Sequence, residues 1–373
     1  MIDNLGGGGA ERVLIYILRQ LDRSLFEVEL FLVIKGGVHF QSIPSDIPYT
    51  SIFKDSDTIG FDPLRLLYRL YRRSMLELFK LFPFVLSFMS GIDKKYDIGI
   101  SFCEGHNTPL LRLKSDHFQK KISWIHIDLR THTCVLSKEQ LRRAIQVADK
   151  LFFVSEDARR GFFFLYPEFD TKSRTEVIYN PIDISAIRKA ASSHLLQKHE
   201  GITLIAIGRL TRQKRFDKLL NVHRRLLDKG LLHRVCILGE GELRGALETQ
   251  IRQLGIEETC SLPGFLDPYP YLDNADVFVS TSDYEGLPVV VCEAMALAKP
   301  ILCTDITGPR ELLENGRMGM LIDNNEQAIE EGLEKMITDA GLRTHYKNIL
   351  EENRGRFIFS SDVKNIEKRL LEL

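Results

Sequence analysis

The sequence predicts an α/β protein made of two domains, each a doubly wound parallel sheet with helices on both faces. A chain of 373 residues is too long for one ordinary core and suits two domains of about 150–200 residues. In both halves, short β-rich runs alternate with amphipathic helical patterns, which is typical of βαβ units. Between residues 183 and 201 the composition turns polar, and the domain boundary is predicted there.

The predicted elements follow in order along the chain. Strands are expected at 27–34, 49–53, 97–102, 121–126, 150–155 and 175–180, and then at 202–208, 234–239, 260–264, 276–281 and 300–304. Helical patterns fill the gaps, for example at 216–227 and 243–254. The domains are placed at 1–183 and 184–358, with a helix at 359–373 expected to cross back to the first domain. Ligands are expected at the carboxyl ends of the strands.

Composition narrows the classes of partner. Lys and Arg number 50 against 51 Asp and Glu, a formal net charge of −1, so no nucleic-acid partner is expected. The six cysteines lack zinc-ligand spacing and suggest buried thiols in a cytoplasmic protein. The longest uncharged stretch, 81–92, is shorter than the roughly 20 residues of a membrane span.

Two glycine-containing loops follow predicted strands of the second half. In GRLTRQKRF (208–216), Gly208 permits close backbone approach, while Arg209 and Lys214 precede a helix and suit a diphosphate. By themselves, two basic loop residues are usually just solvated. In LGEGELRG (238–245), Gly239 opens a strand-to-helix turn, and a tight turn is about as good an explanation as ligand contact.

A third loop, DYEGLPVVVCEAMA (283–296), carries two carboxylates. Pro288 suits the first turn of a helix, which puts Glu285 on the preceding loop and Glu293 in the second turn. Such a pair can accept hydrogen bonds from vicinal sugar hydroxyls, while the backbone at Gly286 and Leu287 remains available for phosphate. The alternative is a helix-dipole acid beside a surface acid.

These segments carry a resemblance that covers nearly the whole chain. The set is GGGGAER (6–12), WIH (124–126), IYNPID (178–183), the Gly-Arg-Leu…Gln-Lys loop, LGEG (238–241) and the Glu-x7-Glu segment. It resembles the retaining family 4 glycosyltransferases of GT-B fold, which have two Rossmann-like domains and act in bacterial polysaccharide or lipid-linked glycan synthesis. One departure is Lys299, where that family commonly has glycine.

The resemblance implies an activity and a set of roles. A sugar would pass with retention from a nucleoside-diphosphate sugar, by default UDP-linked, to a glycan or lipid-linked hydroxyl acceptor, with neither cofactor nor metal. Arg209 and Lys214 would hold the diphosphate, and Glu293 would bind the ribose. Glu285 would lie against the donor sugar. The backbone of Gly8 and Gly9 would approach the phosphates, and His126 would face the sugar near the acceptor.

One short motif in the first half matches a metal-binding pattern but is not expected to bind a metal. Asp55-Ser56-Asp57 spells Asp-x-Asp, the metal motif of the other large glycosyltransferase fold. It follows a short first-domain strand with no supporting acid, so a solvated loop is the better interpretation.

Residues 63–89 form a basic amphipathic segment with interleaved aromatics. From 65 to 80 it contains five Lys or Arg against the single acid Glu77. The residues fit equally a helix on an anionic membrane surface and a core helix with a solvated basic face. The resemblance, in which acceptors are often lipid-linked, favours the inner face of the cell membrane.

Two other functions would also be compatible with a chain of two α/β domains. An NAD(P)-dependent oxidoreductase would want a ribose-binding acid after the next strand, and a bilobal solute-binding protein would need export; neither feature is evident. Only five residues precede Gly6, so we also expect the chain to lack its natural beginning, with a frayed or absent first strand and an unfilled central slot in the first-domain sheet.

Overall fold

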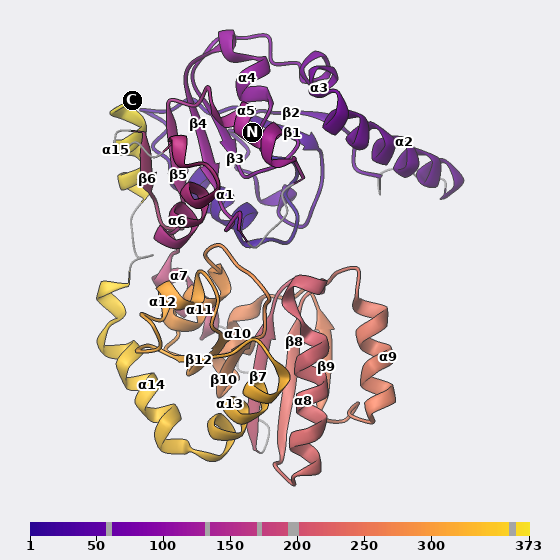
Figure 1. Cartoon of the computed structure of the whole chain (residues 1–373), viewed down its shortest axis with the longest axis vertical. Coiled ribbons are helices and arrows are strands. Elements are labelled where there is room, and N and C mark those ends of the chain that lie inside the picture. Colours follow the sequence, from indigo (N-terminus) through magenta and orange to yellow (C-terminus); the bar gives the residue numbers. More distant parts are fainter. Residues whose placement is uncertain (57–61, 131–134, 170–173, 193–200, 358–362) are drawn as a thin grey trace. The chain divides into compact units, whose positions relative to one another are not determined.

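The chain forms two compact units, drawn in Figure 1. The computed structural model describes residues 1–56, 62–130, 135–169, 174–192, 201–357 and 363–373. Unit 1 comprises Met1–Pro181 and Asp362–Leu373, and unit 2 comprises Ile182–Ser361. Among the described residues, every strand pair within both units is parallel.

Unit 1 holds a two-stranded and a four-stranded sheet, in the orders β1-β2 and β3-β4-β5-β6. Its strands are β1 (Leu30–Ile34), β2 (Tyr49–Phe53), β3 (Tyr96–Phe102), β4 (Phe118–Ile125), β5 (Lys150–Phe153) and β6 (Thr175–Val177). Its α-helices are α1 (Gly9–Gln20), α2 (Asp62–Leu81), α3 (Pro83–Met89), α4 (Leu110–Leu113), α5 (Lys138–Ile145), α6 (Glu156–Leu165) and α15 (Val363–Leu371). The last helix, α15, is tied to unit 1 by Glu367, which accepts from Asp22 N at 2.7 Å.

Residues 1–3 lie between the two sheets of unit 1. Ile2 bridges Leu32 of β1 in parallel, and the amide of Phe102 in β3 donates to Met1 O at 2.9 Å. Ile2 and Leu5 are both buried. No regular strand forms there, but the prediction of an unfilled central slot was wrong, because the backbone of Met1–Asp3 hydrogen-bonds to both neighbouring strands.

Helix α2 is unusually exposed for an amphipathic helix of 20 residues, and it extends away from the sheets of unit 1 (Figure 1). Phe79 is its one buried residue. Apolar side chains of α2 and α3 that stay exposed are Leu64, Leu66, Leu67, Leu70, Tyr71, Leu81, Phe84, Phe88 and Met89. The end of α2 and helix α3 do pack into a core cluster of unit 1 through Phe79 and Leu86, whereas the first half of α2 keeps its apolar side chains exposed.

Unit 2 contains one six-stranded sheet of order β12-β11-β10-β7-β8-β9. Its strands are β7 (Ile202–Ile207), β8 (His233–Leu238), β9 (Cys260–Gly264), β10 (Val277–Ser280), β11 (Ile301–Thr304) and β12 (Met320–Ile322). Its α-helices are α7 (Ile184–Ala191), α8 (Phe216–Asp228), α9 (Arg244–Leu254), α10 (Pro268–Asn274), α11 (Val289–Ala296), α12 (Pro309–Leu312), α13 (Glu326–Thr338) and α14 (Ala340–Glu352).

The strand order of unit 2 reverses between β7 and β10, where neighbouring strands are far apart in sequence. In open α/β sheets, ligands bind outside the carboxyl ends of strands at such a switch point. The core beneath it packs α8, α9 and α13 against one face through Leu219, Leu247 and Leu333, all buried. Because this core is rigidly packed, the loops at the carboxyl edge start from fixed positions.

Candidate active site

The switch point of unit 2 brings together two loops. The β7 loop (residues 208–215) includes the short 3₁₀ helix Arg212–Lys214, and the β10 loop (residues 281–288) leads into α11. Asp283 N donates to Gln213 O at 2.8 Å, and Thr281 Oγ1 donates to Lys214 O at 2.9 Å. These bonds fix the backbone of each loop against the other.

Glycines allow neighbouring loops to approach at two points of this edge. A Cβ on Gly239, where φ is +145°, would lie 1.9 Å from the carbonyl oxygen of Gly208. A Cβ on Gly308, where φ is +86°, would lie 2.3 Å from the carbonyl oxygen of Gly286. Both positions combine a backbone conformation that favours glycine with space for no side chain. The glycines therefore hold four loops close together at the carboxyl edge.

Lys214 and Glu285 meet at the centre of this edge. Lys214 Nζ lies 2.6 Å from Glu285 Oε1, and the two side chains are 14% and 10% exposed. Ser282 Oγ donates to the same oxygen at 2.8 Å, while Gln213 Nε2 lies 3.4 Å from Oε2. The structure thus places these two predicted site residues in direct contact.

Arg209 differs from Lys214. Its side chain is exposed, and no hydrogen bond or ion pair joins its guanidinium to any residue within the described ranges. An exposed guanidinium beside a switch point can bind an anion without first giving up a protein partner. The β7 loop therefore offers one cation that is already paired and one that is open to solvent.

Glu293 is buried on α11, with 1% of its surface exposed. Tyr269 Oη, from α10, donates to Glu293 Oε1 at 3.2 Å. Pro288 is the N-cap of α11 and supplies no side-chain cap. Amide groups at such a helix start lack partners within the helix and attract anions. Gly286 and Leu287 precede this start, which is where the sequence predicted phosphate contacts.

An ion-pair network that the sequence did not predict supports the β7 loop. Arg215 adopts a left-handed backbone conformation with φ of +49°. Its guanidinium contacts Asp217 at 3.1 Å and Asp283 at 3.2 Å. The buried Lys218 approaches the same Asp283 at 3.5 Å and donates to Asn324 Oδ1 at 2.8 Å. Asp283 therefore ties the loop before α8 to the loop after β10.

The carboxyl edge of unit 1 carries different chemistry. Gly8 is the N-cap of α1 and Gly9 its first residue, with no side-chain cap. Beside them, Asp3 Oδ2 accepts from His106 N at 2.9 Å and Oδ1 from Asn107 N at 2.9 Å. Burial would raise the pKa of Asp3, but its hydrogen bonds and the charge interaction with His106 hold that pKa below the usual value.

His126 follows β4 and lies beside Glu104, which follows β3. Glu104 Oε1 accepts from His126 N at 2.7 Å. Burial lowers the pKa of His126 to about 3, so its ring is neutral at physiological pH, and its Nε2 has no partner among the described residues. Burial also raises the pKa of Glu104 to about 7. Sequence patterns could have indicated Glu104 only through its position at a strand end.

Within the described ranges, no group of three His, Cys, Asp or Glu residues could hold a metal ion. Asp57 of the Asp-x-Asp motif lies outside the described residues. No helix in the described part of the chain is long and apolar enough to cross a bilayer.

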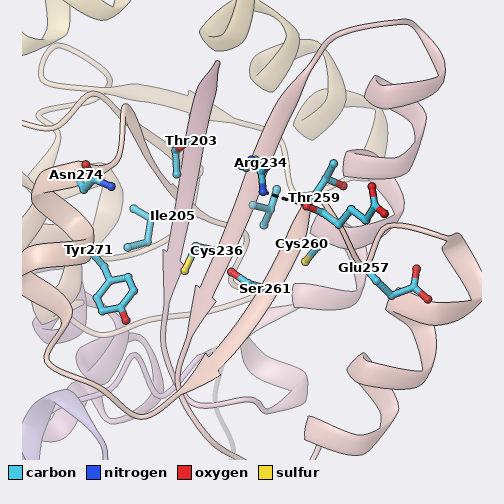
Figure 2. Close-up of a pocket in the computed structure, with 12 residues that line it drawn as sticks. Thr203, Ile205, Arg234, Cys236, Glu257, Thr259, Cys260, Ser261, Tyr271 and Asn274 are labelled. Carbon is cyan, nitrogen blue, oxygen red and sulfur yellow. Dashed lines mark hydrogen bonds between the residues drawn. The ribbon is translucent and has the colours of Figure 1, made fainter. Parts of the chain in front are cut away.

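A cavity of about 490 Å³ lies elsewhere in unit 2. Figure 2 shows Thr203, Cys236 and Ser261, from three adjacent strands, on the sheet face that lines it. Arg234 is anchored at its rim by a 3.0 Å hydrogen bond to Glu258 O. Thr203, Arg234 and Ser261 are the second residues of β7, β8 and β9, and Cys236 lies in the middle of β8. The cavity contains none of the predicted site residues and lies away from the carboxyl edge.

Comparison with known proteins shows which family and fold this chain resembles. Residues 188–353 match the model of the family Glycosyl transferases group 1. The crystal structure of Anabaena HepE in complex with UDP superposes with a TM-score of 0.69 at 18% identity, covering 100% of this chain and 98% of that one. The fold is therefore GT-B, with two Rossmann-like units, and residues 188–353 are similar to this glycosyltransferase family.

Two sequence relatives add detail. The chain is 26% identical to N-acetylgalactosamine-N,N'-diacetylbacillosaminyl-diphospho-undecaprenol 4-alpha-N-acetylgalactosaminyltransferase of Campylobacter jejuni, over 93% of this chain and 92% of that protein. It is 31% identical to an uncharacterized glycosyltransferase of Methanocaldococcus jannaschii, over 48% of this chain and 53% of that protein. This chain thus spans about half the length of the second relative.

Proposed function

We propose that the protein transfers a sugar from a UDP-linked donor to a hydroxyl of a lipid-linked or polysaccharide glycan, with retention of anomeric configuration. The observation that carries this proposal is the pairing of Lys214 with Glu285 beside Arg209 at the switch point of unit 2. The name of the Campylobacter jejuni relative supports a lipid-diphosphate-linked acceptor. The UDP bound to the Anabaena protein supports the donor base.

In this proposal the diphosphate binds to Arg209 and Lys214. The exposed guanidinium of Arg209 takes the anion directly, and the helix start after Pro288 contributes backbone dipoles. Close approach of the backbone to the diphosphate is allowed or provided by Gly208, Gly239, Gly286 and Leu287. As the glycosidic bond breaks, negative charge develops on the leaving diphosphate, and preorganised cations stabilise it. No metal ion is needed for this role.

Glu293 binds the ribose hydroxyls, and Glu285 binds the donor sugar. Glu293 is held by Tyr269, which orients one carboxylate oxygen. In unit 1, the neutral His126 faces the sugar near the acceptor, as the family resemblance implies. The backbone of Gly8 and Gly9 approaches the phosphates.

A panel of nucleotide sugars tests the proposal. UDP-glucose, UDP-galactose, UDP-N-acetylglucosamine and UDP-N-acetylgalactosamine are incubated with the protein and a synthetic polyprenyl-diphosphate-linked N-acetylhexosamine, with and without EDTA. We expect UDP release with at least one donor, unchanged by EDTA. Thermal stabilisation by NADPH or by free sugars, with no UDP release from any donor, would instead favour one of the two rival functions.

We also propose that α2 and α3 lie on an anionic membrane surface. On α2 the basic Arg72 and Arg73 follow a group of exposed leucines at 64, 66, 67 and 70, and Phe88 of α3 is 85% exposed. An amphipathic helix of this kind buries its apolar side in the interface while its cations meet acidic headgroups. A lipid-linked acceptor would be reached at that surface.

Liposome sedimentation tests the membrane proposal. Changing Arg69, Arg72 and Arg73 together to Glu should abolish binding to anionic vesicles, at about 1 kcal/mol for each basic residue near the surface. The matched control changes Arg224, Arg252 and Lys335 of unit 2 to Glu and should still sediment. Wild-type protein that stays in the supernatant at low salt would contradict the proposal.

A further inference from the structure

The ion pair at the switch point occupies groups that the donor would also need. Lys214 Nζ is the cation assigned to the diphosphate, yet it contacts Glu285 Oε1 at 2.6 Å. Both side chains are nearly buried, at 14% and 10% exposure. In such a place the attraction between the charges is offset by the cost of removing them from water, and removing one partner leaves a costly unpaired charge.

The two oxygens of Glu285 are used unequally. Oε1 accepts from Lys214 and from Ser282, at 2.6 and 2.8 Å. Within the part of the chain that the structure describes, Oε2 has only the 3.4 Å contact from Gln213, whose amide also donates to Tyr284 O at 2.8 Å. A carboxylate has about four acceptor positions, so Glu285 can accept further hydrogen bonds, chiefly at Oε2.

The backbone around Lys214 is held by contacts that do not involve its ammonium. Thr281 Oγ1 holds the carbonyl oxygens of Lys214 and Arg215, at 2.9 and 3.2 Å. The lysine side chain has four methylene groups, and its one ion pair among the described residues is with Glu285. A diphosphate placed at the edge can therefore draw the ammonium away without moving the loop.

We infer that Lys214 is exchanged between Glu285 and the diphosphate, so that Glu285 makes the site select an intact nucleotide sugar over the nucleoside diphosphate product. This inference rests on the proposed function. When Lys214 turns to a phosphate, Glu285 loses its counter-ion. The sugar of an intact donor replaces that contact with hydroxyl donors, whereas a bare nucleoside diphosphate leaves the carboxylate unpaired.

The exchange has a consequence for turnover. After the sugar leaves, Glu285 again competes with the diphosphate for Lys214, and this competition weakens the hold on the product. The same residue pair thus favours donor binding before transfer and product release after it.

Isothermal titration with UDP and with the UDP-sugar that the panel selects tests the exchange. In Glu285→Gln the competing charge is absent, so we expect UDP to bind about tenfold more tightly, equal to about 1.4 kcal/mol. The UDP-sugar should gain nothing or bind more weakly. Unchanged or weaker UDP binding by this variant would overturn the inference while leaving the proposed function intact. Wild-type protein that binds neither UDP nor any UDP-sugar would overturn both.

A double-mutant cycle assigns the effect to Lys214. In a Lys214→Gln background, Glu285→Gln should change UDP affinity by less than about twofold, because no cation remains to be released. A tenfold gain in that background would contradict the exchange. If Glu285→Gln does not fold, Glu285→Asp withdraws the carboxylate by one methylene group and should give a smaller gain in UDP affinity. No gain with a folded Asp variant would overturn the inference.

Discussion

The carboxyl edges of the two units share a topology and differ in charge. In unit 2 the edge presents the cations Arg209 and Lys214. In unit 1 the corresponding edge gathers Asp3, Glu104 and a neutral His126. Cationic side chains suit a diphosphate, whereas carboxylates beside a neutral imidazole suit hydroxyl groups, so in unit 1 a phosphate would be met by the backbone of Gly8 and Gly9 and not by a cation. Doubly wound topology fixes where a ligand binds, and the side chains after each strand decide which ligand.

The largest effect is expected from the cations of unit 2. Arg209→Ala and Lys214→Ala should each lower kcat by about 10²-fold or more, because preorganised donors to developing charge contribute most to such rates. Together they should cost less than the product of the single effects, since both act on one leaving group. UDP release is the measurement, and Arg252→Ala on α9 is the control. Equal rates in all variants would show that the cations of the unit 2 edge do not contribute to the reaction.

Glu293 should give the next effect. Glu293→Ala removes charge-assisted hydrogen bonds worth about 1.5–3 kcal/mol, so donor Kd should rise about 10- to 100-fold. Tyr269→Phe removes only the hydroxyl that orients the carboxylate and should have a smaller effect in the same titration. A donor Kd that does not change in Glu293→Ala would exclude the ribose assignment.

A buried histidine pair in unit 2 should make the stability of the protein depend on pH. His223 Nδ1 lies 2.7 Å from His233 Nε2, and burial lowers the pKa of His223 from 6.5 to about 3. The unfolded state therefore binds more protons below pH 6.5, and stability falls as pH decreases. At pH 5 the loss is about 2 kcal/mol. Urea unfolding of wild type and His223→Gln at pH 5 and 7 measures it. An equal pH dependence in both proteins would refute this prediction.

Glu104 should produce the opposite dependence of stability on pH, and the smallest effect. Burial raises its pKa from 4.5 to about 7, so the folded state holds the proton more tightly and stability falls as pH rises from 4.5 to 7. Because the side chain is partly exposed, the loss is about 1–2 kcal/mol. Glu104→Gln should remove it in urea unfolding at pH 5 and 8. A variant that loses as much stability as wild type would show that Glu104 ionises normally.

Much of the fold was predictable because apolar runs bounded by turns mark buried parallel strands. The run at 202–208 became β7 and that at 260–264 became β9, each within a residue of its prediction. The sequence missed β12, since Met320–Ile322 is too short to show a period. It also left residues 63–89 open, because a helical period identifies an apolar face but not whether anything covers it.

The site was predictable only in part, for a physical reason. Arg209, Lys214, Glu285 and Glu293 stand after strands or at a helix start, and local patterns point to such places. The contact between Lys214 and Glu285 joins residues 71 apart in sequence, and that between Asp3 and His106 joins residues 103 apart. Contacts of this kind follow from strand order, which a single sequence does not specify.

A crystal structure with bound UDP tests the central claim most directly. We predict that the diphosphate contacts Arg209 and Lys214 at the carboxyl edge of unit 2, with the ribose on Glu293. UDP bound elsewhere, for example in the cavity lined by Thr203, Cys236 and Ser261, would contradict the assignment of the donor site.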